Sequence, residues 1–169
     1  MAGTVNDDAP RILVDADACP VKDEVVRVAE RHGLAVVLVS NRWHRDDHYL
    51  VEKVVAPEGL DAADDIIAER ARADDVVVTA DIPLAARCLA KGARPIDPRG
   101  RSFAEANIGM QMAMRDLMKT LRETGEVTGG PRSFTRQDRS RFLDGLETLV
   151  CAVKRARLTA VAPMPFPTE

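Results

Sequence analysis

The chain has 169 residues, a formal net charge of −3, 46% hydrophobic residues and 30% charged residues. That length fits one domain with a substantial core, and that charge does not indicate a strongly basic nucleic-acid-binding protein. Because only 4% of the residues are aromatic, aliphatic side chains must build the core.

Apolar runs alternate with amphipathic stretches up to about residue 96. Buried strands are predicted at 11–14, 35–39, 53–56, 76–80 and 94–96. Helices are predicted between them at 20–32, 61–73 and 83–91, and Gly33 and Gly92 would end the first and the third. Strands that alternate with helices imply a mostly parallel central sheet with helices on both faces, which is a three-layer α/β fold.

After residue 100 the strand signal stops and two more helices are predicted, at 105–124 and from near Thr135 to about Arg157. Thr135 and Asp138 resemble a capping box in which Asp replaces the usual Glu. We expect this helical C-terminal part to pack on the sheet. The result would be a single domain of residues 11–157, between a disordered lead (1–10) and a flexible tail (158–169).

The cysteines, Cys19, Cys88 and Cys151, are far apart and lack CxxC spacing. This argues against a disulfide framework or a zinc site and favours a reducing, cytoplasmic setting. The first residues lack the basic and apolar regions of a secretory signal. No stretch approaches 18 apolar residues, so no membrane segment is expected.

Acidic residues stand where predicted strands end. Asp15 and Asp17 follow the first strand, and Asp81 follows the fourth. Ligands of an open parallel sheet bind at the carboxyl ends of its strands, and carboxylates that converge there need a cation to coexist. The pattern predicts Mg²⁺ or Mn²⁺ and phosphate chemistry. The alternative is that Asp17 and Asp81 cap the helices that follow them.

A second acidic group lies at the start of the helix predicted at 61–73. Asp61, Asp64 and Asp65 have the spacing i, i+3 and i+4, which places them near one helix face. A helix N-terminus could explain Asp61 and Asp65. We therefore predict a metal-site role first for Asp64 and then for Asp61.

Other acidic residues are expected to have structural or solvent-exposed positions rather than a role in the metal site. Asp74 and Asp75 precede a strand and read as a solvated loop, and Asp97 before Pro98 reads as a turn residue. Arg99 also follows a strand end, and could reach the acidic pocket or a substrate phosphate.

The segment after the second strand holds the only tryptophan of the chain, Trp43, between Arg42 and His44, with Arg45 next. Such a loop could stack on a base and hold phosphates. It could equally be a surface loop with one anchoring aromatic residue.

Six segments, VDADACPVKDEV, GLDAADDII, VVTADIPLA, PRG, MRDLMKTLR and TGGP, occur in that order. Together they closely resemble the YaiI/YqxD family of uncharacterised bacterial proteins, over about residues 12–153. The resemblance implies a PIN-like fold, related to PIN and NYN nuclease domains that cut RNA with an acidic Mg²⁺ or Mn²⁺ site. It also allows a homodimer through the C-terminal helices, which could instead cover one face of the sheet.

Carried over by position, Asp15 looks like the first metal-binding Asp of PIN-like nucleases. Asp64, or Asp61, looks like the acidic residue of the intermediate helix, and Asp81 looks like the carboxylate after the next core strand. NYN-type nucleases commonly have another Asp two residues later, where this chain has Pro83. Asp17 could supply the missing charge.

The leading hypothesis is a metal-dependent PIN-like ribonuclease. Asp15 and Asp81 would hold the metal directly, and Asp17 and Asp64 would bind through water or hold a second ion. Arg99 and the loop 42–45 would position the RNA.

The runner-up is a phosphatase resembling the haloacid dehalogenase class, with Asp15 as nucleophile and Asp17 as general acid–base. Thr79 or Ser40 would then imitate the hydroxyl motif, but Cys19 replaces the expected Thr or Val. The third hypothesis, motivated by Pro83, is a protein that binds metal and RNA, or a nucleotide, without cutting.

Overall fold

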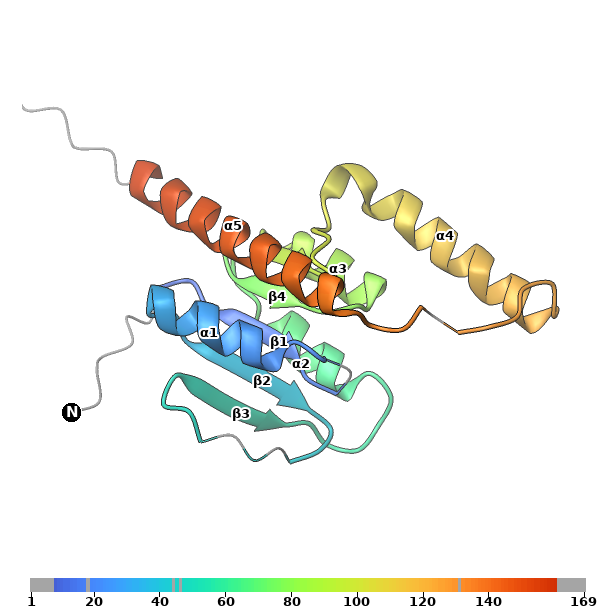
Figure 1. The fold of residues 1–169 in the computed structure, drawn as a ribbon, viewed down its shortest axis with the longest axis horizontal. Helices are drawn as coiled ribbons and strands as arrows, with labels where there is room; N and C mark the ends of the chain where they lie inside the picture. The colour runs from blue at the N-terminus through green and yellow to red at the C-terminus, as the bar shows by residue number, and fades with distance from the viewer. Residues whose placement is uncertain (1–7, 18, 44, 46, 131, 161–169) are drawn as a thin grey trace, which may run out of the picture.

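The computed structural model describes residues 8–17, 19–43, 45, 47–130 and 132–160 (Figure 1). The elements in chain order are β1 Ile12–Asp15, α1 Lys22–His32, β2 Val36–Ser40, β3 Val51–Val55, α2 Ala62–Arg70, β4 Val76–Val78, α3 Ile82–Leu89, β5 Arg94–Ile96, α4 Glu105–Glu123 and α5 Arg136–Ala160. Each predicted strand and helix is present. The ends differ by up to three residues: β3 begins two residues earlier than predicted, and α5 continues to Ala160, three residues beyond the predicted end.

The sheet has the strand order β3-β2-β1-β4-β5, and every neighbouring pair is parallel. The prediction of a parallel sheet is therefore confirmed. The chain winds outward from β1 through β2 to β3 and then restarts beside β1 with β4. The strand order thus reverses between β1 and β4, and the carboxyl ends of these two strands form the switch point where open α/β sheets bind ligands.

Two hydrophobic clusters lie on the two faces of the sheet, because successive residues of a strand point to opposite sides. Ile12 and Val14 belong to the cluster that α1 and α5 cover. Leu13 belongs to the cluster that α2 and α3 cover. Figure 1 shows α1 and α5 side by side across one face. The predicted three-layer arrangement is confirmed.

The two C-terminal helices differ in how they are packed. Helix α5 buries Phe142, Leu146, Val150 and Val153 in the first cluster. Helix α4 packs against α3 (Figure 1). It has no buried residue. The expectation that the whole C-terminal part packs on the sheet is therefore right for α5 and wrong for α4. Within the described ranges, no helix combines the length and the apolar composition needed to cross a membrane.

The loop after β5 approaches α5 closely at two glycines. Gly100 has a φ of 89°, and a Cβ at this position would lie 2.4 Å from the carbonyl oxygen of Arg141. A Cβ on Gly145 would lie 2.9 Å from the carbonyl oxygen of Gly100. A larger residue at either position would push α5 away from the loop, so the two glycines set how closely α5 is seated.

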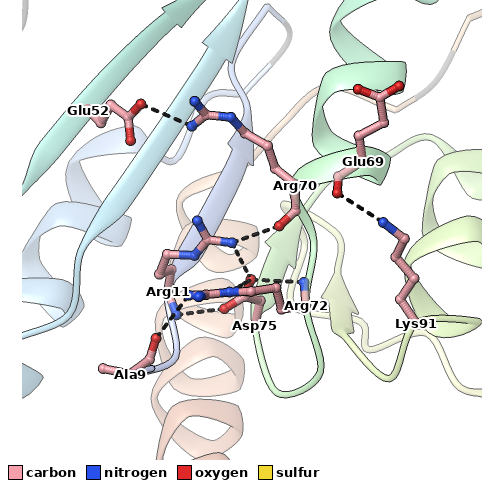
Figure 2. A network of polar contacts seen from close by, with 8 residues as sticks. All are labelled: Ala9, Arg11, Glu52, Glu69, Arg70, Arg72, Asp75 and Lys91. Atoms are coloured by element: carbon pink, nitrogen blue, oxygen red, sulfur yellow. Dashed lines mark hydrogen bonds and ion pairs between the residues drawn. The ribbon is translucent and has the colours of Figure 1, made fainter. Parts of the chain in front are cut away.

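The amino edge of the sheet carries a buried ion pair (Figure 2). The side chain of Asp75 is 1% exposed and accepts hydrogen bonds from the backbone N–H and from Nη2 of Arg11, both at 2.9 Å. The backbone N–H of Arg72 donates to the same carboxylate at 3.0 Å. The interpretation of Asp75 as part of a solvated loop is therefore wrong. This residue ties the start of β1 to the turn before β4.

Candidate active site

Asp15 ends β1 at the switch point and is half-buried. Its Oδ2 accepts a hydrogen bond from the hydroxyl of Thr79 at 3.2 Å. Thr79 is buried just after β4, and its hydroxyl oxygen also accepts from the backbone N–H of Asp81 at 3.0 Å. One threonine therefore links the acidic residues that follow the two central strands.

The aspartates at this edge are close enough for their negative charges to affect one another's pKa. Burial raises the pKa of Asp15, the Thr79 hydrogen bond lowers it, and the negative charges of Asp17 and Asp81 raise it further. Burial, followed by the charges of Asp81, Asp15 and Asp61, raises the pKa of Asp64 to about 6. Each of the five aspartates that the sequence singled out for this site therefore interacts electrostatically with Asp15 or with Asp64.

Asp81 has a structural function as well. Its Oδ1 accepts a hydrogen bond from the backbone N–H of Leu84 at 2.8 Å, which caps α3, and Pro83 stands in the first turn of that helix. The helix-cap alternative for Asp81 is therefore confirmed. The cap uses Oδ1 alone, so a role for the carboxylate in the acidic site remains compatible with it.

Asp17 does not cap α1. Both of its carboxylate oxygens accept from the backbone N–H of Asn41, at 2.8 and 3.0 Å, and Oδ1 also accepts from the hydroxyl of Ser40 at 2.6 Å. Helix α1 begins after Val21 without a side-chain cap. The cap alternative for Asp17 is therefore wrong, and the residue joins the ends of β1 and β2. Ser40 ends β2 just as Asp15 ends β1, and this placement at a strand end is the sequence signal that could have identified Ser40 and Asn41 as partners of Asp17.

A hard divalent cation fits the chemistry of these donors. Among the described residues, no Lys, Arg or His forms an ion pair with the five aspartates. No three of them bring ligand oxygens within 4.8 Å of one another. In the described part of the chain only His32, Glu147 and Cys151, between α1 and α5, meet that criterion. Mg²⁺ is commonly held by one or two carboxylates and otherwise by water and substrate phosphate, so one or two converging aspartates suffice.

The residues predicted to bind substrate do not all lie within the acidic site. Thr79 lies within the site. Arg42 follows Ser40, and the Ser40 hydroxyl donates to its carbonyl at 2.8 Å. Trp43 is 67% exposed, with the ammonium group of Lys53 5.1 Å from its ring centroid. Arg45 is exposed, and His44 lies outside the described residues.

Arg99 is held at the start of α5. It donates to Oδ2 of Asp138 at 2.7 Å and to the carbonyl of Arg132, and it lies over the ring of Phe134. Asp138 also forms the predicted capping box, since the N–H of Thr135 donates to Asp138 and the N–H of Asp138 donates to Thr135. The structure therefore does not bring Arg99 to the aspartates.

Asp97 is a turn residue, as predicted, because its carboxylate accepts hydrogen bonds from the backbone N–H groups of Arg99 and Arg101.

Fold and site together define a doubly wound, all-parallel α/β protein with an acidic switch point. The family model described as "Uncharacterized BCR, YaiI/YqxD family" matches residues 13–152, and the chain belongs to that family. The resemblance seen in the six sequence segments is thus confirmed.

Relatives in other bacteria are similar over nearly their whole length. A "UPF0178 protein" of Parvibaculum lavamentivorans is 59% identical over 145 residues, which cover 85% of this chain and 95% of the relative. One from Rhodopseudomonas palustris strain BisB5 is 54% identical over 153 residues, which cover 90% and 93%. One from Bradyrhizobium diazoefficiens is 54% identical over 159 residues, which cover 94% and 95%. No solved structure matches the chain. These names specify no activity.

Proposed function

We propose that this protein is a metal-dependent ribonuclease of PIN-like type, which cuts RNA phosphodiesters at the acidic edge with Mg²⁺ or Mn²⁺. One observation supports this most strongly. Burial and the neighbouring negative charges raise the pKa of Asp15 and of Asp64 at the switch point, while Arg87, whose charge lowers the pKa of Asp64, forms its ion pair with Asp65. Such an arrangement costs stability unless a positively charged ligand compensates for it.

The roles follow from the contacts. Asp15 and Asp81 would hold the cation, because Asp15 ends β1 and Asp81 follows β4 at the switch point. Thr79 would orient Asp15 through its hydroxyl. Asp64, whose pKa is about 6, would hold or release a proton close to neutral pH. A bound divalent cation supplies positive charge to the phosphate and lowers the pKa of water.

The hydrogen bonds of Asp17 support the nuclease over the phosphatase. A general acid–base must exchange a proton with the leaving group, but both oxygens of Asp17 already accept hydrogen bonds from the end of β2.

The test is cleavage of end-labelled single-stranded RNA with Mn²⁺ or Mg²⁺, against EDTA. We expect Asp15→Asn and Asp81→Asn each to lower the rate by more than about 100-fold, since even outer-shell changes at metal sites cost about 10–100-fold. Asp65→Asn is the matched control, because Asp65 starts the same helix as Asp64 but pairs with Arg87 at 2.8 Å. It should cut at nearly the wild-type rate.

Three results would overturn the proposal. Cleavage that survives both substitutions would place the chemistry elsewhere. Saturable RNA binding without cleavage in either metal would make the protein a binding protein, and hydrolysis of p-nitrophenyl phosphate through an acid-labile adduct on Asp15 would favour the phosphatase.

A further inference from the structure

A groove of about 470 Å³ runs between α4 and the carboxyl edge of the sheet. Ala80 and Ile82, the chain neighbours of Asp81, both line it. The groove therefore adjoins the acidic site. Its other wall is α4, the helix that buries no residue in the fold.

The lining combines an apolar part with positive charge. Phe103, Met114 and Met118 supply apolar surface. Arg101 and Arg115 supply two of the three guanidinium groups.

Arg122, which lies seven residues and so about two turns after Arg115 on α4, supplies the third guanidinium group. Asp97 is the one acidic residue among those that line the groove, and its Oδ1 already accepts from the backbone of the β5 turn. Arg115 is paired with Asp116 at 3.5 Å, on an exposed part of the helix. Exposed pairs of this kind contribute little, so this arginine can exchange its partner for a phosphate.

One polar group in the groove lacks a partner. Gln111 of α4 lines it, and its buried Oε1 has no hydrogen-bond partner among the described residues. A buried acceptor without a donor is unfavourable. A ligand that brings an N–H group, as a nucleobase does, would supply the missing donor after a rotation of the amide.

We propose that this groove binds unpaired nucleotides of RNA next to the acidic site. Bases would pack on Phe103 and the methionines, and backbone phosphates would contact the three arginines. Unpaired bases expose the faces and edges that such a lining can contact, whereas a duplex keeps its bases stacked inside. That the bound strand is then cut rests on the function proposed above.

A second copy of this chain is the competing occupant, because Met110 and Leu117 of α4 are 75% and 50% exposed. A two-fold dimer across the groove would place the same arginines of both copies near each other. Like charges brought together out of water are costly. Charge therefore favours an anionic strand over a second copy.

The experiment is fluorescence anisotropy of a short, end-labelled single-stranded oligouridylate in EDTA, where no metal-dependent cutting occurs. We expect the double variant Arg115→Ala/Arg122→Ala to weaken binding by at least about tenfold. It should also lower the magnitude of the salt slope by about 1.4, because each phosphate contact on a single strand contributes about 0.7. The control is Arg27→Ala/Arg155→Ala, which removes two exposed arginines of α1 and α5 and should bind within about twofold of wild type.

Phe103→Leu tests the apolar part, because it keeps much of the packing volume and removes the aromatic face. We expect it to weaken binding by about fivefold or more. Equal affinities for the groove variants and the control pair would overturn the proposal, as would equal binding of duplex and single-stranded RNA. A dimer by sedimentation that Met110→Asp dissociates, and that competes with RNA, would assign the groove to a second copy.

The two proposals can fail separately. Groove-dependent binding in EDTA without cleavage in Mn²⁺ would overturn the nuclease and support the groove. Metal-dependent cleavage whose rate and KM are unchanged in the α4 variants would support the nuclease and overturn the groove.

Discussion

The aspartates at the two edges of the same parallel sheet have opposite kinds of neighbours. At the amino edge, Asp75 is 1% exposed and receives Arg11 and two backbone N–H groups (Figure 2). At the carboxyl edge, Asp15 and Asp64 have hydroxyl or acidic neighbours, and among the described residues no cation forms an ion pair with either. The chain has 24 lysines and arginines, so cations were available for both edges.

The start of α5 follows the pattern of the amino edge. The backbone N–H of Thr135, together with the Arg132 side chain, lowers the pKa of Asp138 to about 2. At the acidic site the pKa of Asp64 moves in the other direction, to about 6. Asp75 and Asp138, which hold the fold together, are paired with arginines, whereas among the described residues no Lys, Arg or His forms an ion pair with the five aspartates of the acidic site. That contrast is what a ligand-binding role for the carboxyl edge predicts.

The largest expected effect on stability is at the amino edge. Asp75→Asn should lower the free energy of unfolding by about 3 kcal/mol or more, because removal of one partner leaves Arg11 without its buried counter-ion. Asp74→Asn is the neighbouring control, since Asp74 pairs with Arg94 only at 3.9 Å. It should cost less than about 1 kcal/mol. Urea denaturation measures both, and equal values would remove the distinction between a paired and a solvated aspartate.

The carboxyl edge should instead respond to metal. At a Mn²⁺ concentration 100 times its dissociation constant, the wild-type protein should gain about 2.7 kcal/mol of stability. EDTA should reverse the gain, Asp15→Asn should abolish it, and Asp65→Asn should retain it. Thermal melts with and without Mn²⁺ measure the effect. An equal metal response in Asp15→Asn would show that the cation binds elsewhere.

Asp81 allows the structural and the ligand roles to be separated. Asp81→Ala removes the cap of α3 and should cost about 1 kcal/mol, whereas Asp81→Asn keeps an acceptor oxygen for the N–H of Leu84. Both variants should lose the Mn²⁺ response. If Asp81→Asn is as unstable as Asp81→Ala in urea, the charge rather than the hydrogen bond holds the helix end.

The smallest effect is the pH dependence contributed by Asp64. Its pKa in the folded protein is about 6, above the ordinary value of 3.8, so its protonated form favours folding. That contribution is fully present below about pH 4 and is lost as pH rises through about 6. Without metal, Asp64→Asn should therefore stabilise the protein at pH 8 by less than about 1 kcal/mol, because solvent screens this partly exposed group. It should have no such advantage at pH 4. A stabilisation that is equal at both pH values would contradict the assignment.

Much of the fold followed from local sequence patterns. The apolar runs predicted all five strands, and amphipathic spacing with glycine stops predicted the helices between them. The parallel sheet then placed residues that follow β1 and β4 at one edge, so Asp15 and Asp81 could be assigned to a shared site before any contact was known. The Thr135–Asp138 capping box could also be predicted from the sequence, because its two residues are three positions apart.

The errors concern contacts between distant parts of the chain. Asp75 pairs with a residue 64 positions away and Arg99 with one 39 positions away, and nothing in the local sequence of either residue indicates such a partner. The apolar spacing of α4 is that of a buried helix, yet the helix buries no residue in this fold.

Periodicity and strand-end placement, which depend on near neighbours, thus determined the architecture and the position of the acidic site from sequence alone. The tertiary structure decided which charges are neutralised, which arginines form ion pairs with α5, and which helix lines a groove beside the acidic site. Those outcomes depend on long-range packing, which brings together side chains that are remote in the sequence.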